Sequence, residues 1–207
     1  GKTGSGKSTI LNLLLNKYEV DQGEILLDDQ KIKTVNTFEF FDQCGVVPQE
    51  VFLFSDTINN NLLFSSNKNI SDEKIIAACK DAKIFDNIMG FPHKMETLLG
   101  ERGVNLSGGQ KQRLSIARAL IREPKLLLFD DCLSAVDTET EEAILENIDK
   151  KSKERTNIIV SHRISSIRNA NHILVIENGS IIEQGSHKDL LSLKGFYSKM
   201  YEQQLND

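Results

Sequence analysis

The sequence opens with GKTGSGKS at residues 1–8, which matches the spacing G-x-x-x-x-G-K-[ST]. Glycines at these positions let consecutive backbone N–H groups turn toward an anion without interference from a Cβ atom. A helix that begins near Lys7 would point its positive end at the same anion. The pattern predicts a phosphate-binding loop, and a flexible glycine-serine linker is the alternative interpretation. The predicted loop consists of Gly1, Lys2, Thr3, Gly4, Ser5, Gly6, Lys7 and Ser8, with Thr9 next to it.

The polar side chains of the loop have expected roles in holding a nucleoside triphosphate. Lys7 would reach the β- and γ-phosphates, the Ser8 hydroxyl would ligate Mg²⁺, and Thr9 would lie near the α-phosphate. A strand normally precedes such a loop, whereas this sequence starts at Gly1 rather than at a methionine and shows no signal-peptide pattern. We therefore expect a piece of a longer protein that begins inside the loop.

A second segment supplies an acidic partner for the loop. The stretch LLLFD at residues 126–130 has the pattern of a buried strand that ends in a carboxylate. In phosphate-loop ATPases a carboxylate at this place holds Mg²⁺. An aspartate after a strand can also cap a helix, which is the structural alternative. Together with the loop upstream, the pattern favours Asp130 as a metal ligand.

Along the chain, short apolar runs alternate with amphipathic stretches, which is typical of an α/β protein with a mostly parallel sheet. Asn178-Gly179 suits the tight turn of a hairpin with arms at 172–177 and 180–183. Residues 50–112 are more helical and irregular, so we expect one domain over 1–207 with a helical subdomain inserted at 50–112. The expected strands are 24–27, 45–47, 125–129, 157–160 and 172–176, the expected helices are 8–16, 72–83, 138–151 and 195–205, and 65–71 is the expected exposed loop.

The composition excludes several other classes of protein. The 207 residues are 39% hydrophobic with a net charge of −5, which argues against broad electrostatic binding to nucleic acid. No apolar run approaches the ~20 residues that cross a bilayer. The three cysteines (Cys44, Cys79 and Cys132) are far apart and odd in number. We expect buried free thiols in a reducing compartment rather than a disulfide or zinc framework.

The family is indicated by LSGGQ at residues 106–110, which is followed by KQR at 111–113 and by ARAL at 117–120. This segment resembles the signature motif of ABC ATPases, and it stands about 20 residues before the acidic strand end, as that family requires. Physically it is a second anion site, because backbone donors gather at a helix N-terminus. A simple helix cap is the alternative interpretation. The resemblance implies nucleotide contacts by Ser107, Gly108, Gly109 and Gln110.

Further landmarks of the same family follow in order. Gln49, after Val46-Val47-Pro48, matches the Q-loop glutamine, which in the family touches Mg²⁺ and the attacking water. SAVD at 134–137 matches the D-loop, so the resemblance implies a nucleotide contact for Asp137. His162, in VSHR at 160–163, matches the switch histidine that contacts the γ-phosphate. A lone histidine after a strand is otherwise usually structural.

The resemblance covers essentially the whole chain, and two segments are similar to ABC exporters in particular. These are VFLFSDTI at 51–58, after the Q-loop, and GERG at 100–103, which looks like the exporter X-loop. The resemblance implies a domain that binds and hydrolyses ATP with Mg²⁺ on the cytoplasmic face of the membrane, as part of an integral transporter. Its implied partners are the transmembrane domains and a second ABC ATPase domain, identical or different, that meets it head to tail. Each ATP then lies between the phosphate loop of one domain and the signature motif of the other.

One residue departs from the family pattern. The position after the acidic strand end is typically glutamate, and here it is Asp131, whose stem is shorter. The expected catalytic residues are Asp131, His162, Gln49 and Lys7. A slow site beside an intact signature motif suggests one half of a heterodimeric exporter. Two alternatives stay open, a non-hydrolysing ATP-gated module and a soluble ABC ATPase that acts on nucleic acid, although the latter usually has duplicated motifs, a coiled-coil insertion or basic extensions.

Overall fold

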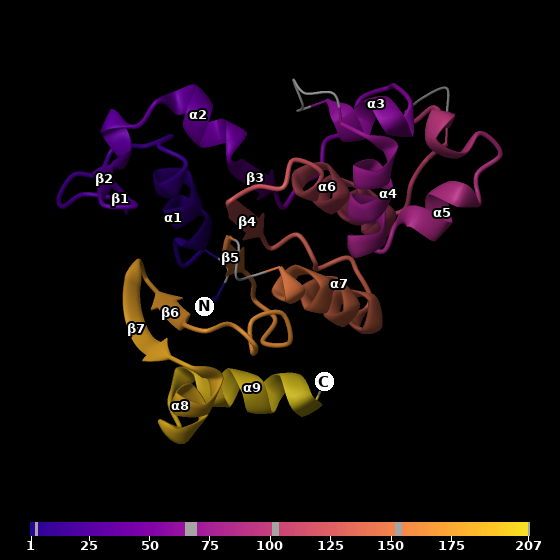
Figure 1. Cartoon of the computed structure of the whole chain (residues 1–207). Helices are drawn as coiled ribbons and strands as arrows, with labels where there is room; N and C mark the ends of the chain where they lie inside the picture. Colours follow the sequence, from indigo (N-terminus) through magenta and orange to yellow (C-terminus); the bar gives the residue numbers. More distant parts are fainter. Residues whose placement is uncertain (3, 65–69, 101–103, 152–154, 207) are drawn as a thin grey trace. The chain divides into compact units, whose positions relative to one another are not determined.

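The computed structural model describes residues 1–2, 4–64, 70–100, 104–151 and 155–206, so Thr3 and parts of the predicted 65–71 and 100–103 loops lie outside it. The chain divides into two compact units. Figure 1 labels the helices and strands of both. Unit 1 consists of Gly1–Phe40 and Ile159–Asp207, and unit 2 consists of Phe41–Ile158.

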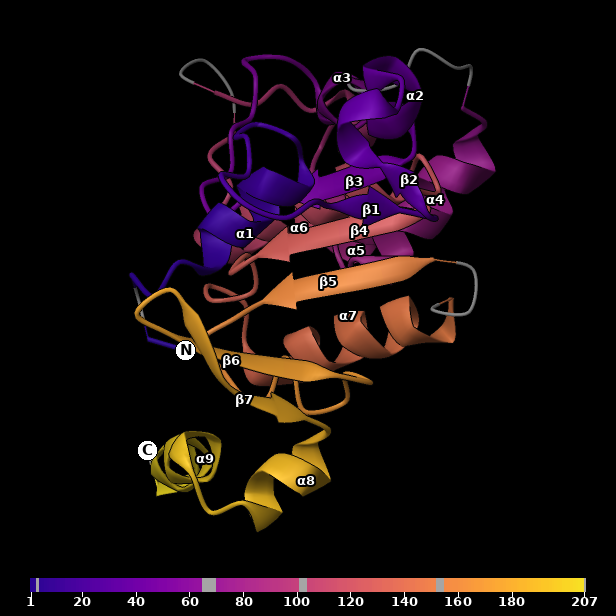
Figure 2. The ribbon, with the colours of Figure 1, turned by 90° about the vertical axis from the view of Figure 1, so that its left-hand side faces the viewer.

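Unit 2 contains two strands of the parallel sheet and the start of the third, which crosses the boundary into unit 1. The sheet order is β3 (Cys44–Val47), β4 (Leu126–Asp130) and β5 (Thr156–Val160), and Figure 2 shows the three strands as neighbouring arrows. The β3–β4 pair is parallel, with Cys44 opposite Leu126 and Val47 opposite Phe129. The side chains of Leu127, Leu128 and Phe129 are almost completely buried, as expected for a strand covered on both faces. The α/β class with a parallel sheet is confirmed.

The helices of unit 2 lie mostly between β3 and β4 in sequence. They pack in a group in which α4 contacts α5, α6 and α7, and α3 contacts α6. The predicted 50–112 segment belongs to this unit, and its standing as a subdomain inserted in one domain stays a prediction. The elements are α3 (Ile58–Leu63), α4 (Asp72–Asp81), α5 (Phe85–Met89), the 3-10 helix η2 (Lys94–Glu96), α6 (Gly108–Leu120) and α7 (Thr138–Lys150).

Unit 1 starts with α1 (Lys7–Leu14), followed by two short strands, β1 (Leu26–Leu27) and β2 (Gln30–Lys31), and the 3-10 helix η1 (Ile32–Thr34). The predicted strand at 24–27 is therefore shorter than expected, and it pairs antiparallel with β2 in a two-stranded sheet. Helix α2 (Thr37–Asp42) crosses the boundary between the units. Neither β2 nor α2 was predicted.

The C-terminal part of unit 1 is a hairpin followed by two helices, β6 (Ile173–Glu177), β7 (Ser180–Gly185), α8 (His187–Ser192) and α9 (Phe196–Asn206). The hairpin is confirmed, and its turn residues Asn178 and Gly179 have positive φ angles of 48° and 76°. Within the described residues, none of the helices combines the length and the apolar character that crossing a bilayer requires.

Candidate functional site

The phosphate loop has the backbone conformation that its glycines predict. Gly4 and Gly6 have φ angles of 80° and 99°, in the left-handed region that favours glycine. Gly6 is also the N-cap of α1, and it has no side chain that could occupy the first amides of the helix. The Lys7 ammonium donates hydrogen bonds to the carbonyls of Gly1 at 2.8 Å and Lys2 at 2.7 Å. The lysine charge and the helix N-terminus are therefore placed at the loop, which fits an anionic ligand.

The turn of the β6–β7 hairpin packs against this loop. The Gly179 N–H donates to the Ser5 carbonyl at 3.2 Å. A Cβ atom added to Gly1 would lie 1.9 Å from the Ile176 carbonyl oxygen, so the loop backbone approaches the end of β6 closely. Sequence reasoning predicted the hairpin but not this contact, because the two segments are far apart in the chain.

His162 also belongs to unit 1. This histidine is exposed. It lies two positions beyond the end of β5, in a segment that forms neither helix nor strand. The Arg163 N–H donates to the Ser161 hydroxyl at 2.9 Å, which fixes a tight local turn. Unit 1 thus holds the phosphate loop and the predicted switch histidine.

In unit 2, the signature motif is the N-terminus of α6. Ser107 is the N-cap, its hydroxyl accepts the Gln110 N–H at 3.2 Å, and the Gln110 side-chain oxygen accepts the Ser107 N–H at 2.9 Å. This reciprocal capping box engages the Gln110 side chain. Ser107 and Gly108 are exposed, and the Ser107 hydroxyl still has its own hydrogen to donate.

The first turn of α6 packs directly against the 134–137 loop. A Cβ atom at Gly109 would lie 2.8 Å from the Ala135 carbonyl oxygen, whereas one at Gly108 would meet only the Ala135 Cβ at 3.6 Å. The buried Gln112 side chain accepts the Ala135 N–H at 3.1 Å. The signature helix and the 134–137 loop therefore form one packed group. Gln112 was missed in the sequence, where its only signal is a polar residue on an otherwise buried helix face.

Asp137, expected as a nucleotide contact, is the N-cap of α7. Its carboxylate accepts the Thr140 N–H at 2.9 Å. Hydrogen bonds from Thr140, with a smaller contribution from the nearby Arg113 guanidinium, lower the pKa of the Asp137 carboxyl. The residue is thus an anion that stabilises the start of α7.

Gln49 lies two residues beyond the carboxyl end of β3, and Asp130 is the last residue of the neighbouring parallel strand β4. Because Val47 is paired with Phe129, both residues lie at the same edge of the sheet, where ligands of α/β proteins usually bind. An amide oxygen and a carboxylate are suitable ligands for Mg²⁺, which commonly takes one or two carboxylates and completes its shell with phosphate oxygens. Within the described ranges, no group of three or more His, Cys, Asp or Glu could hold a metal by itself. The donor set fits a metal that is bound together with nucleotide.

Asp131 follows directly and has a φ angle of 47°. Aspartate tolerates this left-handed conformation better than most residues because its short side chain can hydrogen-bond locally. The next residue, Cys132, is buried, and burial together with the neighbouring carboxylates raises the pKa of its thiol. Burial also raises the pKa of Cys44 to about 11 and of Cys79 to about 12. The prediction of buried free thiols is confirmed.

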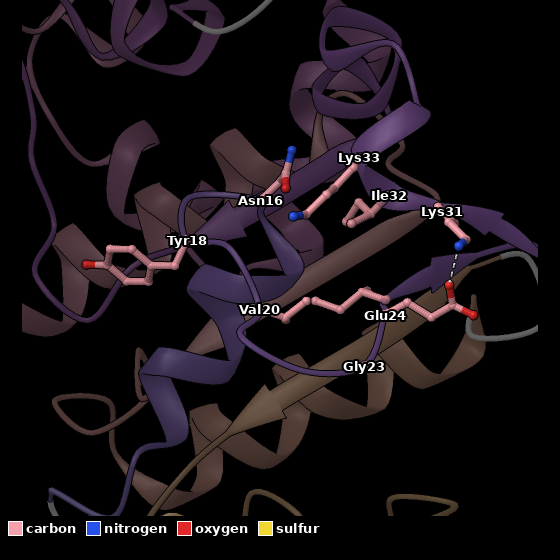
Figure 3. Close-up of a pocket in the computed structure, with 9 residues that line it drawn as sticks. Asn16, Tyr18, Val20, Gly23, Glu24, Lys31, Ile32 and Lys33 are labelled. Atoms are coloured by element: carbon pink, nitrogen blue, oxygen red, sulfur yellow. Dashed lines mark ion pairs between the residues drawn. The ribbon is translucent and has the colours of Figure 1, made fainter.

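A pocket in unit 1 lies between the end of α1 and the β1–β2 hairpin (Figure 3). Its volume is about 180 Å³, and a Glu24–Lys31 ion pair of 2.8 Å lies at its side. None of its lining residues belongs to the phosphate loop or to the other predicted site residues. The pocket is therefore separate from the predicted site.

The fold and the loops define a nucleotide-binding α/β domain of the phosphate-loop class. A family model described as "ABC transporter" matches residues 1–134. The chain is 49% identical over 206 residues to the ATP-dependent lipid A-core flippase of Pasteurella multocida, covering 100% of the chain and 35% of that protein. It is 44% identical over 197 residues to human ATP-binding cassette sub-family B member 5, covering 95% of the chain and 16% of that protein.

A comparison with solved structures also identifies an ABC exporter. A bacterial Atm1-family ABC exporter with ATP bound superimposes with a TM-score of 0.93 at 43% sequence identity, covering 99% of this chain and 36% of that one. The chain belongs to the ABC transporter family, as its ATPase domain. It spans about a third of the length of the flippases that it matches.

Proposed function

We propose that this domain hydrolyses ATP to drive an ABC exporter. The observation that carries the proposal is the phosphate loop, in which two glycines have left-handed φ angles and the Lys7 ammonium lies at the loop backbone. The exporter assignment is supported by relatives at 43–49% identity that are named flippases or exporters. All three alignments extend over nearly the whole chain.

The predicted site residues would have different roles in ATP hydrolysis. Backbone amides of residues 4–8 and the Lys7 ammonium would bind the β- and γ-phosphates and offset the charge that develops during cleavage. Asp131 would orient the attacking water, with Gln49 beside it, and His162 would contact the γ-phosphate. Ser8, Gln49 and Asp130 would hold Mg²⁺, which supplies charge neutralisation to the phosphate oxygens when it is bound.

A second ATPase domain would complete each site. Ser107 and Gly108 are exposed at the N-terminus of α6, where backbone donors favour an anion. In the proposed head-to-tail arrangement these donors contact ATP that is held by the loop of the partner subunit. ATP then joins the two domains, and hydrolysis separates them and changes the facing of the transmembrane domains. The domain would work at the cytoplasmic face of the membrane.

Asp131 favours a second candidate function, an ATP-gated module with little hydrolysis. An aspartate places its carboxylate one methylene closer to the backbone than a glutamate does, and a misplacement of about 1 Å can cost about 100-fold in rate. The same observation is compatible with a slow site in a heterodimer whose other site turns over faster.

The test is phosphate release by the complete protein in lipid nanodiscs, measured together with binding of fluorescent ATP. We expect Mg²⁺-dependent release that vanadate and a chelator both abolish. Tight binding without release would support the gated module instead. Absence of both binding and release would contradict both functions.

A further inference from the structure

Gln204, near the end of α9, uses both ends of its side-chain amide on one loop. Its Nε2 donates to the His162 carbonyl at 2.8 Å, and its Oε1 accepts the Ile164 N–H at 2.8 Å. The loop and the glutamine are about 40 residues apart in sequence, and both lie in unit 1. One side chain therefore brackets the backbone that carries the predicted switch histidine.

The bracketed segment needs such partners because it has neither helix nor strand to pair its backbone groups. An amide side chain has an acceptor and two donors in one plane, so it can satisfy a carbonyl and an N–H at once. A carboxylate lacks the donor, and an asparagine has a shorter stem. The two contacts together therefore require a glutamine side chain.

The helix that carries Gln204 is firmly anchored in unit 1. Tyr197 is buried in a core cluster with Ile164, and three further side chains of α9 that pack on this cluster are Phe196, Met200 and Tyr201. The Glu183 carboxylate accepts the Phe196 and Tyr197 N–H groups at 2.5 and 2.9 Å, which caps the start of the helix. Helix α9 is therefore held in unit 1 by apolar packing and by a capped first turn.

The first turn of α9 also touches the phosphate loop. The Lys2 ammonium lies 5.8 Å from the centre of the Phe196 ring, a cation–π contact. Helix α9 thus contacts the loop at its beginning and the His162 segment near its end. Both parts of the predicted site in unit 1 rest on the same helix.

We propose that Gln204 is a positioning residue for His162. The proposal rests on the proposed function, in which His162 contacts the γ-phosphate. Gln204 fixes the backbone on both sides of Arg163. The backbone position from which the His162 imidazole extends is therefore fixed as well. Without the amide, the segment loses the two Gln204 hydrogen bonds at the His162 carbonyl and the Ile164 N–H, and it shifts.

The experiment compares Gln204→Ala with Gln203→Ala in the complete protein. Both variants replace an exposed glutamine on the same helix turn, and within the described residues the Gln203 side chain makes no hydrogen bond. We expect Gln204→Ala to lower kcat for ATP hydrolysis by about 10-fold with an unchanged KM, because a small displacement of a catalytic contact costs rate rather than binding. Gln203→Ala should keep the parental kcat and Tm, and Gln204→Ala should still unfold in one cooperative transition.

Two further variants make the outcome decisive. Gln204→Glu keeps the acceptor for Ile164 but sets a carboxylate oxygen against the His162 carbonyl, so it should be slower than Gln204→Ala. In a His162→Ala background, Gln204→Ala should have no additional effect, because both changes act on one contact. Equal kcat values for the Gln204 and Gln203 variants, in an enzyme that His162→Ala inactivates, would overturn the positioning role alone. Full activity of His162→Ala would overturn the role of His162 in the proposed function, and this inference with it.

Discussion

Asp131→Glu is expected to raise the rate of ATP hydrolysis by about 100-fold. The longer stem would bring the carboxylate to the distance at which most ABC ATPases orient the attacking water. Asp131 follows β4 directly, so the strand fixes the direction from which the side chain enters the site. Single-turnover phosphate release in the complete protein measures the effect without interference from product release.

The same substitution is expected to cost stability, because the backbone at position 131 has a φ angle of 47°. Glutamate lacks the short polar side chain that makes this conformation acceptable for aspartate, and the penalty is about 1 kcal/mol. Thermal unfolding should therefore show a lower Tm for the faster enzyme. Asp131→Asn is the matched control, since it keeps the size and the tolerated conformation but loses hydrolysis. An unchanged rate in Asp131→Glu would rule out the slow-site hypothesis.

Gly109→Ala is expected to lower ATP hydrolysis by about 100-fold or more, because it displaces the signature helix or the 134–137 loop. Its Cβ would lie 2.8 Å from the Ala135 carbonyl oxygen, a backbone atom that cannot rotate away. The Gln112–Ala135 hydrogen bond holds the two segments together, so the strain has no easy release. We expect a loss of about 1–3 kcal/mol in the free energy of unfolding.

Gly108→Ala is the matched control for stability. Its Cβ would meet only the Ala135 Cβ at 3.6 Å, an ordinary contact, and alanine favours a helix more than glycine does. Chemical denaturation should therefore place this variant at or above the parental stability. Equal destabilisation of both variants would contradict the close packing of Gly109 on the 134–137 loop.

The elements that sequence reasoning predicted are those with strong local signals. The run at 126–130 is long enough and apolar enough to be a buried strand, and the structure has β4 at Leu126–Asp130. The Asn178-Gly179 turn was predicted because few other dipeptides accept two positive φ angles. The predicted helix at 72–83 ends earlier, at Asp81, since Lys83 has a left-handed φ of 54°. No residue pattern in the sequence predicts this conformation.

The contacts that sequence reasoning missed join residues far apart in the chain. Gln204 is 42 residues from His162, and Gln112 is 23 residues from Ala135, so neither pairing leaves a periodic trace. For Gln110 and Asp137, the sequence could not distinguish a nucleotide contact from a helix cap. Both residues were expected to contact nucleotide, and the structure places both in helix caps. The same residue types occur at helix caps and at anion sites, because both are found where a helix N-terminus has unpaired N–H groups. Their direct contact with nucleotide stays a prediction.

We propose that two groups of backbone donors, at residues 1–8 and 107–109, hold one triphosphate from opposite subunits. The most direct measurement is a structure of the complete Asp131→Asn protein with ATP and Mg²⁺, in which the absence of hydrolysis traps the closed state. We predict that the Ser107 hydroxyl and the Gly109 N–H lie within hydrogen-bond distance of the γ-phosphate that the partner subunit's phosphate loop holds. A closed, ATP-bound dimer in which the start of α6 faces away from the phosphate would contradict the claim.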